Sequence, residues 1–183
     1  AFFKNEDLRI DFDEMSYDQI SFLLVAKGNV KIYDLKRELF AETEIIFFNK
    51  AEKTLESPTE SIIKDKIKNK FTTKTFKYNL KNNILKIKDS TYQDIENNKF
   101  KFELAYINTL TNKLFGKDVE IDLNNKSFNK DNEPRLKGNS VKVDKNLVEI
   151  TKGVFTTCKK REKCPPWQLS AESIQHDKKK QII

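Results

Sequence analysis

Apolar and polar side chains alternate along most of this chain, in short runs that usually end at an Asp or an Asn. A period of two places successive side chains on opposite faces of a β-strand, with one face in a core and the other in water. The runs follow one another at roughly the spacing of antiparallel hairpins. The pattern predicts strands that include residues 30–34, 76–79, 84–89, 99–104, 119–122 and 141–144.

The residues between these runs are typical of turns. The chain has four Gly and four Pro, so Asn, Asp and Lys must make most of its turns, and Asn tolerates left-handed backbone well. The Pro residues lie between the runs, where proline does not interrupt a ladder. Residues 33–44 show no helical stripe, so we expect a turn and then a strand there. With no segment rich enough to be a linker, we expect one elongated domain over residues 1–183.

Two passages look like copies of one strand–turn unit. Residues 35–49 and 110–124 both contain Leu-x3-Leu-Phe followed by a small residue and a strand that ends in Asn. A looser copy covers residues 169–177. Repeated units of this kind stack on their neighbours and share a continuous core.

Charge is distributed unevenly. Residues 1–60 contain 13 acidic and 8 basic side chains, a net charge of −5, whereas residues 61–183 contain 15 acidic and 27 basic ones, a net charge of +12. Such an excess attracts nucleic acid, acidic membranes, or phosphorylated lipids and glycans. An AT-rich genome would also enrich Lys, Asn and Ile, so charge alone leaves both explanations open.

The residue types that catalysis and metal binding need are scarce. His176 is the only histidine, and the chain has no Gly-rich phosphate loop. The longest apolar run, residues 22–26, is far too short for a transmembrane helix. We expect no enzymatic activity, no metal and no cofactor.

Lysine-rich strands with aromatic residues allow a second interpretation, a nucleic-acid platform on which bases stack. Strict alternation, however, places the lysines and the aromatic rings on opposite faces, and the chain has only four arginines. A core function for the aromatic residues is favoured, and no nucleic-acid partner is expected.

The segment from Phe155 to Asp177 is the most specific pattern. It reads Phe-Thr-Thr-Cys158, a basic stretch, Cys164-Pro-Pro-Trp167, and then a strand with Ala171, Ile174 and Asp177. This resembles the N-terminal periplasmic (OstA-like) domain of LptD, the outer-membrane lipopolysaccharide assembly protein. In that family a Tyr-Thr-Thr-Cys or Tyr-Thr-Ser-Cys segment precedes a Pro-rich loop and a Trp-x3-Ala-x2-Ile-x2-Asp strand.

The resemblance implies an all-β fold, an antiparallel two-sheet V-shaped β-jellyroll with an open groove between the sheets. In such a domain the acyl chains of lipopolysaccharide lie in the groove, and about 0.8 kcal/mol is gained per buried methylene. Groove residues follow only from strand faces. We expect lipid contacts from Ile32, Phe47, Phe76, Tyr78, Phe102, Tyr106, Val119, Ile121 and Val143.

The resemblance also assigns Cys158 and Cys164 to the disulfides that link such a domain to its barrel. Here the two cysteines could instead pair with each other or remain reduced. Trp167 is expected to anchor its loop against the sheet.

The partners that the resemblance implies are lipopolysaccharide, an LptA-like bridge protein paired to the N-terminal edge strand, and the outer-membrane barrel with its lipoprotein plug. The location would be the periplasm, attached to the outer membrane, in a domain excised from a longer chain with a C-terminal barrel. One alternative is a bridge module of the same fold, similar to LptA or LptC. Another is a glycan-binding or structural β-sandwich without a lipid groove.

Overall fold

A computed structural model describes residues 1–5, 7–66, 68–124, 132–145, 147–160 and 165–177. The described residues form fourteen β-strands, all paired antiparallel. The strands are β1 (Phe2–Asn5), β2 (Leu8–Asp11), β3 (Glu14–Asp18), β4 (Leu23–Asp34), β5 (Leu39–Asn49), β6 (Thr54–Ser57), β7 (Ser61–Lys64), β8 (Lys70–Asn79), β9 (Ile84–Gln93), β10 (Lys99–Asn108), β11 (Lys113–Asp122), β12 (Arg135–Val143), β13 (Leu147–Thr156) and β14 (Leu169–Asp177).

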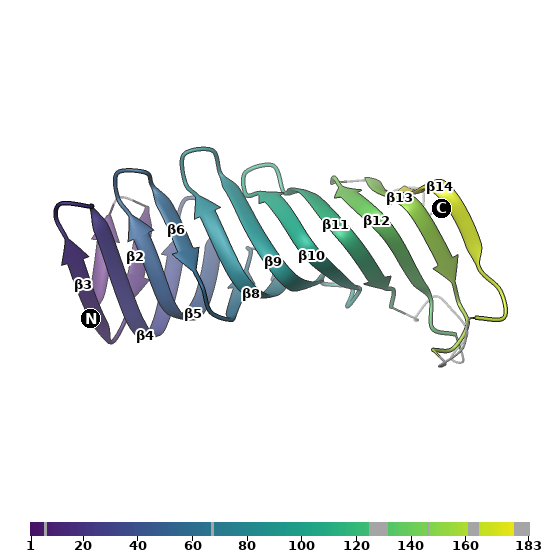
Figure 1. The fold of residues 1–183 in the computed structure, drawn as a ribbon, viewed down its shortest axis with the longest axis horizontal. Coiled ribbons are helices and arrows are strands. Elements are labelled where there is room, and N and C mark those ends of the chain that lie inside the picture. Colours follow the sequence, from purple (N-terminus) through teal and green to yellow (C-terminus); the bar gives the residue numbers. More distant parts are fainter. Residues whose placement is uncertain (6, 67, 125–131, 146, 161–164, 178–183) are drawn as a thin grey trace.

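The strands follow one another almost in chain order. The hydrogen-bonded path runs β1-β2-β4-β5-β6-β8-β9-β10-β11-β12-β13-β14, while β3 pairs with β4, and β7 lies between β5 and β8. Figure 1 shows the strands side by side along the long axis, with the two termini at opposite ends. A second, fainter layer lies behind the front strands at the N-terminal end. The molecule is therefore an elongated meander that folds over on itself.

Each long strand contains a break near its middle, and in β5 and β8 to β13 the alternation of buried and exposed residues shifts there by one position. In β9, for example, Leu85 and Ile87 are buried, but the next buried residue is Ser90. In β4 the pairing with β5 shifts between Lys27 and Val30, as in a β-bulge. Bulges bend a strand, and a one-residue shift also reverses which side chains face the core, so each long strand contributes to two surfaces.

The breaks divide the sheet into two arms. Arm A contains β3, β6 and residues 23–27, 45–49, 75–79, 84–88, 104–108, 113–117, 140–143, 147–151 and 173–177. Arm B contains β1, β2, β7 and residues 30–34, 39–43, 70–73, 90–93, 99–102, 119–122, 135–138, 153–156 and 169–171. Their inner faces share one hydrophobic core, as in a V-shaped jellyroll.

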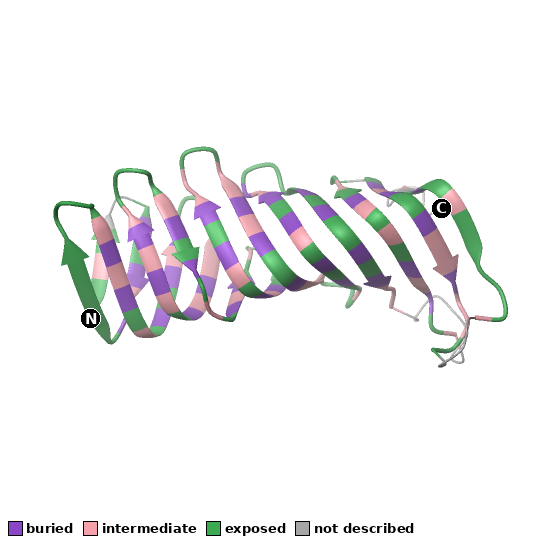
Figure 2. Ribbon diagram, in the orientation of Figure 1, coloured by how far each residue is buried: buried purple, intermediate pink, exposed green. Residues whose placement is uncertain are grey.

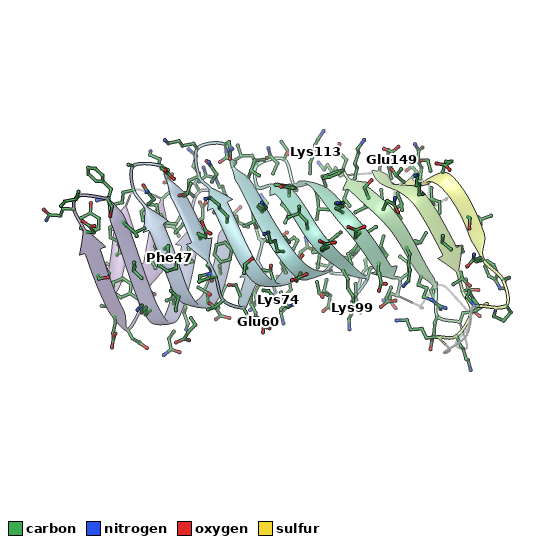
Figure 3. All side chains as sticks on the ribbon, viewed as in Figure 1. Phe47, Glu60, Lys74, Lys99, Lys113 and Glu149 are labelled. Atoms are coloured by element: carbon green, nitrogen blue, oxygen red, sulfur yellow. The ribbon has the colours of Figure 1, made fainter. Side chains whose placement is uncertain are left out.

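The breaks align across neighbouring strands into one line, which we call the break row. From β8 to β13 it consists of Lys74, Asp89, Glu103, Asp118, Asn139 and Lys152, each flanked on both sides by registered pairs. Several break positions have positive φ, including 46° at Asp89 and 51° at Asp118. Aspartate tolerates this backbone better than apolar residues do, which explains the acids at these two positions. Figure 3 shows Lys74, together with Glu60 from the break between β6 and β7, along one margin of the molecule.

Buried residues recur along the strands of both arms (Figure 2), and their side chains form the core. The largest fully buried ones include Phe48, Leu24 and Leu55 toward the N-terminal end and Ile121 and Val141 further along the chain. At about 25 cal/mol per Å² of apolar surface, this strip is the main favourable contribution to folding. A core of this shape is long and narrow.

The all-β antiparallel prediction is confirmed, and the predicted runs correspond to halves of strands. Residues 30–34, 76–79, 119–122 and 141–143 are the second halves of β4, β8, β11 and β12, while 84–89 and 99–104 are the first halves of β9 and β10. Strands were expected to end at Asp89, for example, but β9 continues through it to Gln93. The predicted turn and strand after residue 34 are also present, as the turn before β5.

Candidate functional site

The inner faces of the two arms form the candidate site. Near the N-terminal end, Ile32 and Ala41 from arm B face Leu55, Phe76 and Leu85 from arm A around a small apolar cavity. The cavity volume is about 20 Å³, enough for a single water molecule. Pockets for drug-sized ligands occupy about 300–1,000 Å³. In this conformation the expected open groove is therefore filled by side chains at this point, and a large apolar ligand would have to displace them.

Most of the nine residues expected to contact lipid lie on these inner faces. Ile32, Phe76, Tyr78, Phe102, Val119 and Ile121 are buried, and Val143 is partly buried against the same core. Three of them, Ile32, Phe76 and Tyr78, line the cavity, and Phe102 is registered opposite Val119 further along arm B. Lipid contact at these positions stays a prediction, since the same side chains form the core.

Phe47 and Tyr106 lie on the outer face of arm A, so their expected inward orientation is wrong. Phe47 lies between the buried Ile46 and Phe48, and Tyr106 lies between the buried Ala105 and Ile107. In both strands the break shifts the alternation by one residue. A period of two that continued from Phe102 would have placed Tyr106 inside.

An aromatic ladder lies on the inner face of arm B, and of its rings only Phe102 was assigned to the site from the sequence. Phe71 and Tyr92 stack with ring centroids 4.6 Å apart, and Phe100 lies 5.3 Å from Tyr92. Phe100 in turn lies 6.3 Å from Phe102. The three strands place these rings opposite one another by register, and the sequence signal was an aromatic residue at corresponding positions of neighbouring runs.

A polar cluster joins the free ends of the two arms, and we call it the clasp. It consists of Asp34 and Arg37 from arm B and its turn, and of Tyr78, Asn83 and Thr109 from arm A and its turns. The Tyr78 hydroxyl donates to Asp34 Oδ2 at 2.9 Å. Arg37 donates from Nη2 to the Leu80 carbonyl at 3.0 Å and from Nε to Asn83 Oδ1 at 2.6 Å. These three hydrogen bonds cross from one arm to the other.

The clasp excludes most of the solvent. Asp34 and Arg37 form an ion pair of 3.1 Å whose side chains are 4% and 11% exposed. The Tyr78 hydroxyl lies 3.1 Å from Thr109 Oγ1, and Thr109 donates to the Asn83 carbonyl. Burial raises the pKa of Tyr78, and the negative charge of Asp34 adds to the shift, so the phenol stays protonated and can donate. The clasp therefore holds the mouth of the V closed at the β4–β5 turn.

The Phe155–Asp177 stretch, which we call the Cys–Trp segment, makes a few polar contacts through its described residues at the C-terminal end of arm B. The Thr156 hydroxyl donates to the Trp167 carbonyl at 2.8 Å, and the Trp167 ring packs edge-on against Phe155 at 6.1 Å. This is the anchoring expected for Trp167. Arg135 donates to the Cys158 carbonyl. Cys164 lies outside the described residues, so the disulfide assignments of Cys158 and Cys164 stay predictions.

Two further observations bear on other kinds of site. Within the described ranges, no group of three or more His, Cys, Asp and Glu side chains is arranged to hold a metal ion. Within the same ranges, no helix has the length and apolar character needed to cross a bilayer.

Comparison with solved structures finds a similar fold, whereas no protein-family model and no curated protein matches the chain significantly. One similar structure is LptH from Pseudomonas aeruginosa, described as the LptA-homologous periplasmic component of the conserved lipopolysaccharide transport device. The TM-score is 0.54 at 16% identity, over 60% of this chain and 81% of LptH. At this identity the likeness concerns the fold, and this chain shares the LptA-like β-jellyroll architecture.

Proposed function

We propose that this protein binds the acyl chains of lipopolysaccharide between its two arms and conducts them along its length. The observation that carries the proposal is the apolar strip inside the V, in a fold that is similar to LptH over 60% of this chain. Acyl chains need only adaptable apolar walls, and about 0.8 kcal/mol is gained for each methylene buried. Phe76, Phe102, Val119 and Ile121 are the proposed wall residues.

Loading requires the arms to separate, because the cavity beside Ile32 and Phe76 has a volume of only about 20 Å³. Acyl chains that enter there replace side-chain contacts with lipid contacts, so apolar surface stays buried. Near the β4–β5 turn the clasp has to open first. The phosphorylated head group would remain outside, where the lysines of residues 61–183 supply positive charge.

The finer assignment that we propose is the terminal carrier before the outer membrane. An LptA-like bridge protein would pair with β1 or β3, and the barrel with its lipoprotein plug would lie beyond β14. In the described part of the sheet, each of these three strands pairs with one neighbour and so presents a second edge for strand addition. The proposed location is the periplasm, and residues 1–183 would act as one domain. The Cys–Trp segment is the feature that favours this assignment.

A bridge module within the periplasm is the second candidate, and the likeness to the LptA homologue LptH favours it. The two candidates differ in the partner expected beyond β14, and both hold lipid in the same way.

Site-specific photocrosslinking tests lipid binding in the interior. A photoreactive phenylalanine analogue replaces Tyr92 on the inner face of arm B, and in a matched control it replaces Thr91, the preceding residue on the outer face. Both side chains are half-buried, so only the face differs. We expect lipopolysaccharide adducts at position 92 and few at position 91. Equal adducts at both positions, or none at either in folded protein, would contradict an interior lipid site.

A further inference from the structure

The outer face of arm A carries a surface that folding does not explain. Two cross-strand rows run over β9 to β12 there. The first row places Lys86, Tyr106, Phe115 and Lys142 opposite one another by register. The second row, two residues nearer the break row, places Lys88, Leu104 and Lys117 together. We call these seven residues the lysine face.

Two aromatic rings at the centre of the lysine face are exposed to solvent. Tyr106 is 37% exposed and Phe115 is 43% exposed, and they are registered neighbours on β10 and β11. The Lys86 ammonium lies 5.7 Å from the centroid of the Tyr106 ring. Leu104 beside them is half-buried. An apolar centre rimmed by cations is the composition of an interaction surface.

The charges of the lysine face are not balanced. Neighbouring Lys77 pairs with Glu56, and Lys113 pairs with Asp144 at 3.0 Å. For Lys86, Lys88, Lys117 and Lys142, no carboxylate lies within 4 Å among the residues that the structure describes. The acidic neighbours are Glu149, registered opposite Lys142 at the margin, and the break-row acids Asp89, Glu103 and Asp118. Figure 3 shows Glu149 and Lys113 near the same margin of the molecule.

The outer face of arm B on the same strands has a different character. Its lysines alternate with acids, as in the pair of Lys137 and Glu120 at 2.5 Å. Thr91 and Thr72 continue the row of Lys137, Glu120 and Lys101 onto β9 and β8. The exposed large apolar residues of β8–β12 are all on arm A. Genome-wide lysine enrichment would affect both faces alike. The contrast therefore points to a function of arm A.

We propose that the lysine face docks the protein on the surface of a bilayer that contains anionic phospholipid. Aromatic side chains favour the head-group region, and each lysine near an anionic surface strengthens binding by about fivefold. A nucleic acid would be the other polyanion, but strands of single-stranded nucleic acid lie in basic grooves, whereas this surface is the outside of a sheet. The charge complementarity stands whether or not the interior carries lipid.

Vesicle co-sedimentation of the whole chain tests the proposal. The probes are vesicles of phosphatidylcholine mixed with phosphatidylglycerol, and vesicles of phosphatidylcholine alone. One variant combines Lys86→Gln, Lys88→Gln, Lys117→Gln and Lys142→Gln. Its control removes the same charge from arm B with Lys64→Gln, Lys70→Gln, Lys99→Gln and Lys101→Gln, all at exposed positions. Circular dichroism checks that both variants keep the fold.

We expect the native chain to bind the anionic vesicles and not the neutral ones, and to release them as salt is raised. The arm A variant should lose about a hundredfold or more in affinity, and the arm B variant about threefold or less. Tyr106→Ser with Phe115→Ser should weaken binding without changing its salt dependence. Equal losses from the two lysine variants would overturn the proposal, as would a native chain that ignores anionic vesicles but binds a single-stranded oligonucleotide through the same lysines.

Discussion

The clasp contains a buried ion pair whose loss should weaken the fold severely, and an exposed pair in the same chain provides the comparison. Arg37→Met removes the partner of Asp34, which is 3% exposed, and removes the donors to Leu80 and Asn83. Breaking a buried pair from one side costs about 3–5 kcal/mol because the remaining charge stays desolvated. At the urea dependence of small domains, the midpoint of unfolding should fall by about 1 M or more.

The matched control is Arg9→Met. Arg9 also pairs with an aspartate at 2.8 Å, but its side chain is 49% exposed, and water replaces the lost partner. We expect its urea midpoint to stay within error of the native one. In the double variant Asp34→Asn with Arg37→Met, much of the lost stability should return, since no charge is left buried. If Arg37→Met were as mild as Arg9→Met, the clasp would not be a desolvated link between the arms.

Three other changes test separate parts of the structure. Gly116→Ala places a Cβ 2.4 Å from the buried Phe102 ring and should lower the free energy of unfolding by about 1–3 kcal/mol in chemical denaturation. The control Lys117→Ala, on the opposite face, should leave it nearly unchanged. An unchanged stability for Gly116→Ala would show that the Phe102 ring can move aside. Burial raises the pKa of the Tyr78 phenol, so the stability that its protonated form contributes is lost only as the pH rises above about 10. Tyr78→Phe removes this titrating group. Above about pH 10 the native chain should therefore lose more stability than the variant. The hydrogen bond from Lys137 lowers the pKa of Glu120, so Lys137→Met should raise that pKa toward its ordinary value in an NMR titration. An unchanged pKa would show that the two side chains are not hydrogen-bonded in solution.

The sequence predicted the strand halves well because each half obeys a period of two over four or five residues. It could not show that halves join through a break, since a bulge changes the phase of the pattern without an obligatory residue type. Asp89 illustrates this, because an aspartate after a strand run indicates a turn, whereas here it adopts positive φ inside a continuous strand. The sequence did contain one signal of the break, a change in the phase of the apolar positions. Leu85 and Ile87 are odd-numbered, but the next apolar residue, Tyr92, is even-numbered.

The same phase change decided which candidate site residues were placed correctly. Phe76 and Ile121 lie in runs that do not cross a break, and Phe102 lies before the break of its run, so the faces of all three followed from alternation. Tyr106 lies beyond the break of β10, and the extrapolated face was the opposite one. The alternation of apolar and polar residues could not predict the clasp, because Asp34 and Tyr78 come together only when the arms fold toward each other.

The break row also determines how the molecule can deform. The ladder is already irregular along this line, so changing the angle between the arms there sacrifices few regular backbone hydrogen bonds. Each strand has its own break, so the break row can bend at one strand independently of the others and need not move as one rigid hinge. One section of the V can widen while a distant section stays shut, with the clasp holding its own section. A bulky apolar ligand would then move along the protein together with a local separation of the arms that passes from strand to strand.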